Sequence, residues 1–319
     1  MLGLNRNLCT RQSFLTIVAC TVFLIGLSNH RNSKDLPKNL PTVSMMEKIQ
    51  LERKNLLKQK CRELKLQLNT NPLPARFKIE DRHQVMYCDV PKAATTNLKG
   101  LMLVLSGIVN MTDLPSLPRV KVHEKNEMRK LVVYGQAGIL KERVGNYTKL
   151  MFVRHPYERL VSAYESKFGS TIINNRYQRR IGAKIIRKYR KNPTPIALEK
   201  CDDVTFPEFV NYVIDEWKLN KKLVDVHWLP AIDLCLPCSI EYDFIGKVET
   251  LEQDVSFLLE KLNETDLIPS FQAKQKAPQT TQSVWRQKMK QLSKQQIKDL
   301  TRIYAADFQI FGYPLDYSV

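Results

Sequence analysis

The chain has 319 residues, of which 43% are hydrophobic, and this supply of apolar side chains excludes a globally disordered protein. Its 50 lysines and arginines outnumber 32 acidic residues and give a formal charge of +18, so nucleic acid, anionic membranes and acidic polysaccharides are the partners that charge alone leaves open. Two of the seven cysteines lie in or beside an apolar N-terminal run. The five downstream are too few for a disulfide-scaffold mini-protein and suit a globular enzyme with two bridges and one free thiol.

An uncharged apolar run near the N-terminus predicts a membrane anchor. Residues 14–28 (FLTIVACTVFLIGLS) would form a helix of only about 22 Å, whereas the hydrocarbon core of a bilayer is about 30 Å thick. Extension back to Leu8 supplies the missing length if the Arg11 side chain reaches the interface. A cleaved signal peptide is the alternative, and in both cases the remaining chain enters the secretory lumen. We expect a cytosolic tail at residues 1–12 and a signal-anchor helix at residues 13–28.

The next segment, residues 29–75, is predicted to be a stem. Its first part is polar and contains Pro37 and Pro41, as linkers do, and apolar residues then recur at helical spacing over residues 45–68. This helix either associates with a second copy of the chain, as in a homodimer, or packs on the globular domain. We expect that domain, the lumenal catalytic unit, at residues 76–319.

Within that domain, short apolar runs typical of buried strands alternate with amphipathic segments typical of helices. Strands are predicted at 84–90, 149–153 and 242–246, and helices at 98–105, 156–168, 206–217, 251–262 and 293–308. The alternation predicts an α/β fold, in which flanking helices cover a central, mostly parallel sheet.

The first chemical motif, PKAATTNLK, follows the first predicted strand and opens a helix. Such a turn directs backbone N–H groups and the positive end of a helix toward one point, which is an anion site. Lys92 adds a full charge, and the hydroxyls of Thr95 and Thr96 can donate hydrogen bonds or cap the helix. No glycine lies between Gln84 and Lys99, so a wide loop around a triphosphate is disfavoured. An ordinary capped helix with a surface lysine is the alternative.

The second motif, FVRHPYERLVSAYESKF, again joins a strand to a helix. Arg154 leaves the strand, Pro156 begins the helix at a favoured position, and Ser162 follows about two turns later. An arginine can bind a phosphate through two parallel hydrogen bonds, and a serine hydroxyl can donate to the same group. Arg159 and Lys167 add further cations, although a solvated polar helix face would look the same. Two anion sites in one α/β domain suit a ligand with phosphates at both ends.

Several ordered segments together resemble the Golgi carbohydrate sulfotransferases. They are the two motifs, RIGAKIIRKYRKN at residues 180–192, HWLPAIDLCLPCSIEYDFIGKVETLEQD at residues 227–254 and DFQIFGY at residues 307–313. The branch that the chain resembles most includes the chondroitin and dermatan 4-O-sulfotransferases and the glucuronyl 3-O-sulfotransferase. The resemblance implies a sulfotransferase fold related to phosphate-binding-loop proteins. It also implies transfer of a sulfuryl group from 3′-phosphoadenosine 5′-phosphosulfate (PAPS) to a glycan hydroxyl, by a single-pass type II protein of the Golgi membrane with its catalytic domain in the lumen.

By the same resemblance, each motif binds one end of the donor. Lys92 and Thr96 would hold the 5′ phosphosulfate, and Arg154 and Ser162 would hold the 3′ phosphate. The whole first segment comprises Pro91, Lys92, Ala93, Ala94, Thr95, Thr96 and Asn97. The whole second segment comprises Arg154, His155, Pro156, Tyr157, Glu158, Arg159, Leu160, Val161 and Ser162.

The acceptor hydroxyl needs a base with a pKa near neutrality, which favours histidine. His227 is the first candidate, because it precedes Trp228, on which a sugar could stack. His123, which lies between the two donor segments, is the second, and Glu165 is a further alternative. Each histidine could instead be structural. Lys92 would be catalytic as well, since its charge stabilises the leaving oxygen.

Other features bear on partners and processing. No metal is predicted, because Cys235 and Cys238 form a lone CxxC pair that suits disulfides better than zinc. Glycosylation triplets begin at Asn110, Asn146 and Asn263.

Residues 177–191 are rich in lysine and arginine beside an apolar stripe, so we expect an outward basic face that follows a polyanionic glycan. A solvated helix face is the alternative. A nucleotide kinase is a rival function, but it would need the missing glycines and a metal-binding carboxylate. A non-catalytic lectin is a second rival, and the lumenal address disfavours nucleic acid as a partner.

Overall fold

The computed structural model describes residues 42–66, 76–123, 145–169, 176–270 and 282–315. The predicted cytosolic tail (1–12) and signal anchor (13–28) lie outside the described residues. Within the described ranges, no helix combines the length and the apolar character needed to cross a membrane.

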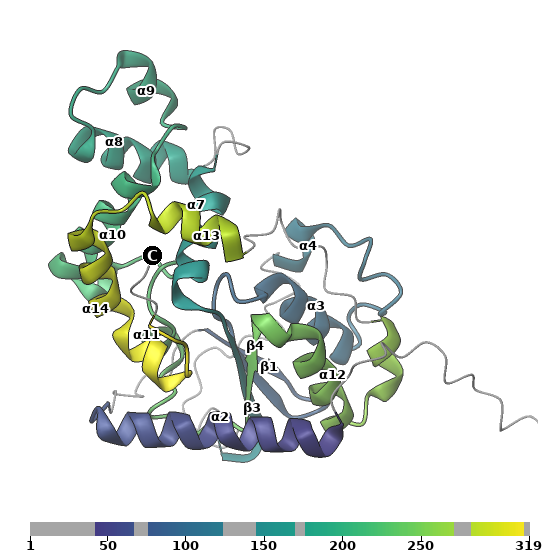
Figure 1. Ribbon diagram of the computed structural model, residues 1–319. Coiled ribbons are helices and arrows are strands. Elements are labelled where there is room, and N and C mark those ends of the chain that lie inside the picture. Colours follow the sequence, from purple (N-terminus) through teal and green to yellow (C-terminus); the bar gives the residue numbers. More distant parts are fainter. Residues whose placement is uncertain (1–41, 67–75, 124–144, 170–175, 271–281, 316–319) are drawn as a thin grey trace, which may run out of the picture. The chain divides into compact units, whose positions relative to one another are not determined.

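A four-stranded sheet in the order β1-β2-β3-β4 forms the centre of the domain (Figure 1). β1 (Phe77–Glu80) runs antiparallel to β2 (Val85–Cys88), whereas β2, β3 (Thr148–Val153) and β4 (Phe244–Lys247) run parallel. The three parallel strands overlap the predicted ones, so the mostly parallel α/β sheet is confirmed. Sequence patterns do not predict β1, because its four residues (FKIE) alternate with charged side chains and form only an edge strand.

Helices and short helical turns flank the sheet, and α8 and α9 lie away from it (Figure 1). In chain order they are α2 (Val43–Glu63), α3 (Thr95–Leu105), α4 (Arg119–His123), α7 (Pro156–Phe168), the π-helix η2 (Gln178–Gly182), α8 (Ala183–Tyr189), α9 (Pro195–Lys200), α10 (Phe206–Leu219), η3 (Lys221–Leu223), α11 (Ala231–Cys235), η4 (Val248–Thr250), α12 (Leu251–Lys261), η5 (Thr265–Ser270), α13 (Gln282–Met289) and α14 (Lys294–Ile310). Several begin where local chemistry dictates: Pro156 opens α7, and capping boxes led by Thr205 and Ser293 open α10 and α14.

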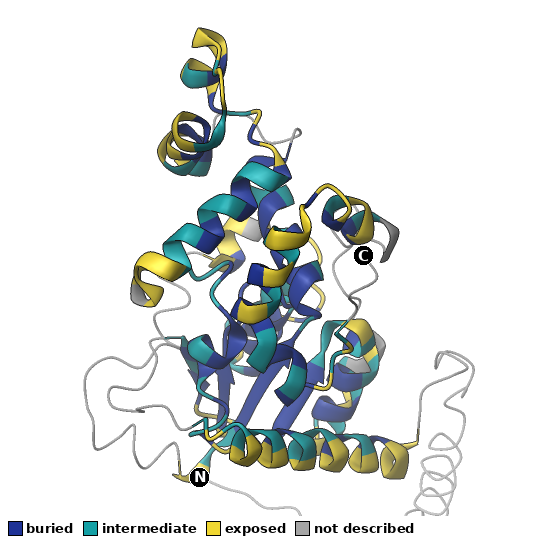
Figure 2. Ribbon diagram, turned by 60° about the vertical axis from the view of Figure 1, so that its left-hand side comes forward, coloured by how far each residue is buried: buried dark blue, intermediate teal, exposed yellow. Residues whose placement is uncertain are grey.

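The core has three parts, which follow from the alternation of side chains along the strands. Tyr87 and Phe152 point to one face of the sheet, where α3 and α12 cover them. Met86 and Met151 point to the other face, which packs against α2, α11 and the end of α14. A third cluster joins α7, α8, α10, α13 and α14. Figure 2 shows the strands buried between these layers, as expected for parallel strands.

Helix α2 packs on the domain. The buried Gln50 side chain both donates to the carbonyl of Ile245 (3.1 Å) and accepts from its N–H (3.0 Å). Arg53 Nη1 reaches the same carbonyl at 2.8 Å and the Asp254 carboxylate at 2.6 Å. Of the two roles predicted for this helix, the structure shows the packed one. Helix α2 therefore belongs to the same compact unit as the sheet.

Two disulfides tie distant parts of the chain to the sheet. Cys61–Cys238 joins α2 to the segment after α11, across 177 residues of sequence. Cys88–Cys235 joins the end of β2 to α11, across 147 residues. Both cysteines of the CxxC pair therefore bond to partners elsewhere. Cys201 is buried and free, so the described cysteines form the two bridges and one free thiol that their number predicted.

Candidate functional site

The two predicted donor segments leave neighbouring parallel strands at the same edge of the sheet (Figure 1). Cys88, the last residue of β2, pairs with Met151 of β3, and β3 ends two residues later at Val153. Residues 89–97 therefore begin beside residues 154–162. Ligands of open α/β sheets bind outside the carboxyl ends of the strands. The structure thus brings the two predicted segments together at an edge suited to a ligand.

The first segment has a backbone suited to an anion. Lys92 and Ala94 have φ values of 71° and 57°, in the left-handed region that non-glycine residues rarely adopt. Such conformations cluster at ligand-binding sites. The eleven-residue helix α3 begins at Thr95 without a side-chain cap. Its first N–H groups and the positive end of its dipole therefore face the loop that carries the Lys92 charge.

Asp89 fixes this loop from the protein side. Its side chain is buried, pairs with Arg76 and Lys99 at 2.9 Å each, and accepts a hydrogen bond from Thr95 Oγ1 at 2.9 Å. Burial by itself would raise the pKa of Asp89, but the charges of Lys99 and Arg76 outweigh it and hold the pKa below its ordinary value. The Thr95 hydroxyl therefore stabilises the loop through its hydrogen bond to Asp89, and the Thr96 hydroxyl is better placed to contact a ligand.

In the second segment, an accessible stripe of α7 continues from Arg154. Glu158 and Ser162 lie four residues apart in α7 and so share one side of the helix, whereas Arg154 precedes the helix. Arg154 Nε contacts Glu158 Oε2 at 3.3 Å. Burial raises the pKa of Glu158, and the Arg154 charge only partly opposes this. The Ser162 hydroxyl makes no hydrogen bond to another described residue, so it remains available to a ligand.

Half of the residues predicted for donor binding are buried, and their side chains face the core. They are Pro91, Ala93, His155, Pro156, Tyr157, Arg159, Leu160 and Val161. The His155 ring lies between the rings of Trp285 and Phe308, while its backbone N–H donates to Glu249 at 2.8 Å. Arg159 is only 2% exposed, so it is not the ligand-facing cation that its place in the motif predicts. These residues could meet a donor only through their backbone.

His227 belongs to a hydrogen-bonded group with Asp225 and Tyr177. Its Nδ1 lies 2.7 Å from Asp225 Oδ1, and its backbone N–H donates to the same oxygen at 2.9 Å. The Tyr177 hydroxyl donates to Asp225 Oδ2 at 3.1 Å. With the proton on Nδ1 and directed at Asp225, the Nε2 atom keeps its lone pair. Among the described residues, none forms a hydrogen bond with Nε2, so the ring is arranged as an oriented base.

Electrostatics favour the neutral form of this ring. Burial lowers the pKa of His227, the hydrogen bond that its ring donates to Asp225 opposes the shift, and the positive charges of Lys167 and Lys92 lower the pKa further. Lys167 Nζ also lies 4.0 Å from the centre of the Tyr177 ring. Because the charge of Lys92 acts on His227, the anion loop and the candidate base share one electrostatic environment.

Sequence patterns do not identify Asp225 or Tyr177 as members of this group. A signal for Asp225 does exist, because an aspartate often accepts from the backbone N–H two residues later, and His227 stands there. Tyr177 is fifty residues from His227 in sequence, and only the fold brings the two together.

The other candidates for the acceptor side lie in different surroundings. His123 Nε2 lies 3.0 Å from Thr96 Oγ1, so this second candidate base also borders the anion loop. The expectation that Trp228 forms a sugar-stacking surface is wrong, because its side chain is completely buried among α10 and α14. Glu165 is engaged in an ion pair with Lys288 at 3.1 Å.

A basic surface extends over η2 and α8, at the end of α7 remote from the sheet (Figure 1). Its exposed cations are Arg176, Arg179, Arg180, Lys184, Arg187, Lys188 and Lys191. Ile185 and Ile186 are buried beneath them, as the apolar stripe predicts. Arg190 anchors the surface through Asp203 at 2.6 Å and Glu208 at 2.8 Å. The predicted outward basic face is therefore present.

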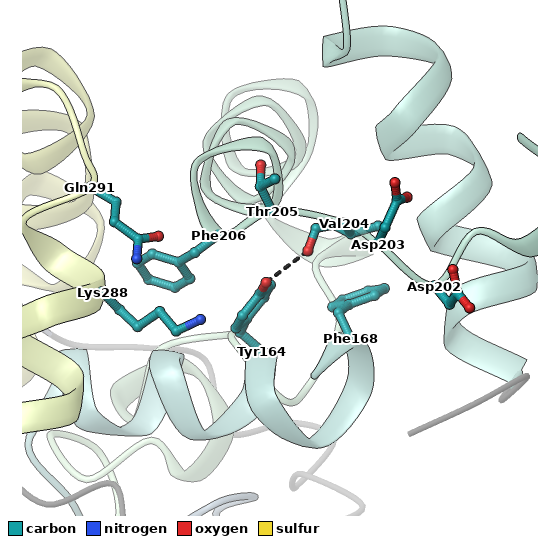
Figure 3. A pocket seen from close by; sticks show the side chains of 9 residues that line it. All are labelled: Tyr164, Phe168, Asp202, Asp203, Val204, Thr205, Phe206, Lys288 and Gln291. Carbon is teal, nitrogen blue, oxygen red and sulfur yellow. Dashed lines mark hydrogen bonds between the residues drawn. The ribbon is translucent and has the colours of Figure 1, made fainter. Parts of the chain in front are cut away.

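A cavity of about 300 Å³ opens elsewhere, between α7, the start of α10 and α13 (Figure 3). None of the predicted donor or base residues lines it. Its Tyr164 hydroxyl donates to the Val204 carbonyl at 2.7 Å, and its Asp203 carboxylate pairs with Arg190. These groups are already engaged, so we place the functional site at the sheet edge.

A protein-family model described as the sulfotransferase family matches residues 75–314, which include both donor segments and His227. The chain belongs to the sulfotransferase family. This sulfotransferase-family chain is 38% identical over 235 residues to carbohydrate sulfotransferase 11 of Mus musculus, covering 74% of this chain and 66% of the relative. It is 33% identical over 297 residues to carbohydrate sulfotransferase 8 of Homo sapiens, covering 88% and 68%. It is 37% identical over 237 residues to carbohydrate sulfotransferase 14 of Danio rerio, covering 74% and 62%.

These matches confirm the family that the motifs predicted. The sulfotransferase-family chain spans just under two thirds of the length of carbohydrate sulfotransferase 11, at 66% for the mouse and rat proteins. No solved structure matches it significantly. In the part of the chain that the structure describes, no group of three or more His, Cys, Asp or Glu side chains could hold a metal ion.

Proposed function

We propose that the chain is a carbohydrate O-sulfotransferase, which moves a sulfuryl group from PAPS to a glycan hydroxyl. The observation that carries the proposal is the shared environment of Lys92 and His227. A cationic loop at an uncapped helix start acts electrostatically on a histidine that a carboxylate orients. The relatives support the reaction class, since each is named a carbohydrate sulfotransferase.

The residues at the sheet edge fit a donor with phosphates at two ends. The uncapped start of α3, together with Lys92 and Thr96, would hold the 5′ phosphosulfate. Arg154 and Ser162 would hold the 3′ phosphate, and the Ser162 hydroxyl has no competing partner among the described residues. When bound, PAPS supplies the sulfuryl group joined to a phosphate leaving group.

The residues of the site then have separate roles in the reaction. Asp225 accepts the Nδ1–H of His227, which leaves Nε2 to take the proton of the acceptor hydroxyl. The acceptor oxygen forms its bond to sulfur while the bond from sulfur to the leaving phosphate oxygen breaks. Lys92 and the first N–H groups of α3 stabilise the charge that develops on that leaving oxygen. His123, beside Thr96, is the second candidate for the base.

The acceptor is proposed to be a polyanionic glycan, of the chondroitin or dermatan type or a related glycoprotein or glycolipid glycan. The exposed cations of η2 and α8 support this class.

The chain is further proposed to be a single-pass type II protein of the Golgi membrane. The apolar run and two disulfides support a secretory address, since disulfides persist in oxidising compartments. Asn110, Asn146 and Asn263 are all exposed, as glycosylation requires.

Transfer of labelled sulfate from PAPS to a panel of desulfated glycans, by the purified full-length chain, tests the proposal. We expect at least one glycan to accept label, and Lys92→Ala to lower kcat by about 10²-fold or more. Lys298→Ala, at an exposed position of α14, should leave kcat unchanged. A lectin would bind the glycans without labelling them, and a kinase would use ATP instead of PAPS. If no glycan in a broad panel accepts label, the acceptor class is wrong.

A further inference from the structure

Arg159 is a buried cation that contacts both halves of the candidate site. Its Nε donates to the carbonyl of Pro91 at 2.9 Å, and its Nη2 donates to the carbonyl of Val226 at 3.2 Å. Pro91 directly precedes Lys92, and Val226 directly precedes His227. One guanidinium therefore holds the peptide group on the N-terminal side of each of the two residues to which the proposed reaction assigns the chemistry.

Burying the Arg159 guanidinium costs desolvation free energy, because a group that is 2% exposed has lost nearly all of its hydration. Burial lowers the pKa of Arg159, while the neighbouring Tyr304 and Asp307 support its charged form. Replacing buried ion pairs by apolar side chains is often neutral or stabilising. Stability alone therefore does not explain a buried arginine here, whereas a planar group with several fixed donors is suited to holding two carbonyls at a set separation.

The same network fixes the segment that follows His227. The Tyr304 hydroxyl donates to the carbonyl of Trp228 at 2.6 Å. The Asp307 carboxylate accepts from the N–H groups of Ala231 and Ile232 at 2.7 and 2.9 Å. Helix α14 thus holds this segment from the C-terminal side of His227. Arg159, on α7, holds it from the N-terminal side and also joins it to the donor loop.

We propose that Arg159 is a positioning residue that sets the separation of Lys92 and His227, and so of the leaving oxygen and the proton acceptor. The proposal rests on the proposed function, because it takes the roles of Lys92 and His227 from there. A misplacement of about 1 Å between reacting groups can lower the rate by about 10²-fold. Loss of the two Arg159 hydrogen bonds should therefore change kcat more than donor affinity.

The test compares Arg159→Lys with Arg53→Lys in the purified full-length chain. Lysine cannot span two carbonyls as the planar guanidinium does. Arg53 is a matched control, because it also links a backbone carbonyl to a second element, yet it lies on α2 and contacts neither loop. For each variant we would measure the melting temperature, the affinity for adenosine 3′,5′-bisphosphate, kcat, and the acid limb of kcat/KM against pH.

Both variants should melt at lower temperature than the parent chain. Arg159→Lys should lower kcat by about 10²-fold with little change in affinity for the bisphosphate. It should also move the acid limb to higher pH, because the Lys92 charge that lowers the pKa of His227 would act from farther away. Arg53→Lys should leave both quantities unchanged. If Arg159→Lys is merely destabilised and keeps the parent kcat and acid limb, the positioning role is overturned.

Two further variants keep the outcome decisive. Arg159→Met removes both hydrogen bonds without a buried charge, and should show the same loss of kcat if Arg159→Lys does not fold. If neither folds, Tyr304→Phe, which releases the Trp228 carbonyl, should lower kcat in the same direction, and a parent-like kcat would count against the proposal. His227→Gln separates the two hypotheses: if it keeps the parent activity and acid limb, the assignment of the base fails, whatever Arg159 does.

Discussion

At the scale of single residues, the surroundings of His227 decide whether it can act as a base. A general base must be unprotonated when the acceptor binds. Burial and the charges of Lys167 and Lys92 lower the pKa of His227, so the neutral ring persists at pH values below the ordinary histidine pKa of about 6.5. Asp225 opposes the shift but fixes the tautomer that leaves Nε2 available. The residue thus combines a lowered pKa with a fixed orientation.

Removing the Asp225 charge tests this balance. Because Asp225 raises the pKa of His227, Asp225→Asn should lower that pKa further and move the acid limb of kcat/KM to lower pH. The same variant should lower kcat by about 10²-fold or more, since the tautomer is no longer fixed. Rates measured from about pH 5 to pH 8 would show both effects. Asp266→Asn, at an exposed position of η5, should change neither, and an acid limb that moves upward would contradict the assignment.

Two serines on α7 allow a matched test of donor binding. The Ser162 hydroxyl has no hydrogen-bond partner among the described residues, whereas Ser166 donates to the Ala163 carbonyl of its own helix at 3.1 Å. Ser162→Ala should therefore weaken the binding of adenosine 3′,5′-bisphosphate by about tenfold, the loss of one hydrogen bond to a charged group. Its melting temperature should hardly change. Calorimetric titration checks this, and an equal or larger loss in Ser166→Ala would refute the role of Ser162.

The residue scale also shows where sequence reasoning reaches its limit. Arg154 and Ser162 are both partly exposed, as side chains that contact a ligand must be. Arg159 has the same chemistry and lies in the same motif, yet it is buried. Its direction depends on Pro91 and Val226, which come from distant parts of the chain. The sequence motif therefore identifies the charged candidate residues, but tertiary contacts determine which of their side chains can face a ligand.

At the scale of elements, strong local sequence signals predict the starts of α7 and α14 correctly. The sequence of β1 carries too weak a signal to predict that strand. Pro156 sets the start of α7, and the capping box led by Ser293 sets the start of α14. β1 is a four-residue edge strand that depends on pairing with β2, so its own sequence carries little signal. For α2, periodicity predicts the helix but not its partner, which Gln50 and Arg53 select by contacting β4.

The two disulfides make a prediction that separates stability from function. They close 177 and 147 residues of sequence, so chain entropy predicts similar losses of about 2–5 kcal/mol when either is removed. Cys61→Ser with Cys238→Ser frees only the end of α2. Cys88→Ser with Cys235→Ser frees the strand end next to Asp89, and should also lower kcat. Unfolding curves and sulfate transfer, measured below both melting temperatures, would show the difference. Equal kcat values in the two folded variants would contradict it.

At the scale of the whole molecule, the positively charged side chains are unevenly distributed. Some of them are neutralised inside the domain, where Lys99 and Arg76 pair with Asp89. A group of exposed cations lies on and beside η2 and α8, at the end of α7 remote from the sheet (Figure 1). A long polyanion that reaches the site could contact this surface while one sugar is modified near His227. A short acceptor would reach the site without it.

Acceptor length therefore tests the basic surface. Lys184→Gln combined with Arg187→Gln should raise KM for a polymeric sulfated or uronate-bearing glycan by roughly fivefold, as expected for two exposed ionic contacts of about 0.5 kcal/mol each. KM for a short oligosaccharide of the same sequence should stay the same, and the difference between the acceptors should shrink with added salt. Lys48→Gln with Arg62→Gln removes equal charge from α2, and should affect neither acceptor because a local surface, rather than net charge, carries the binding. Equal effects of the two double variants would assign the polymer's advantage to net charge and remove the role of η2 and α8.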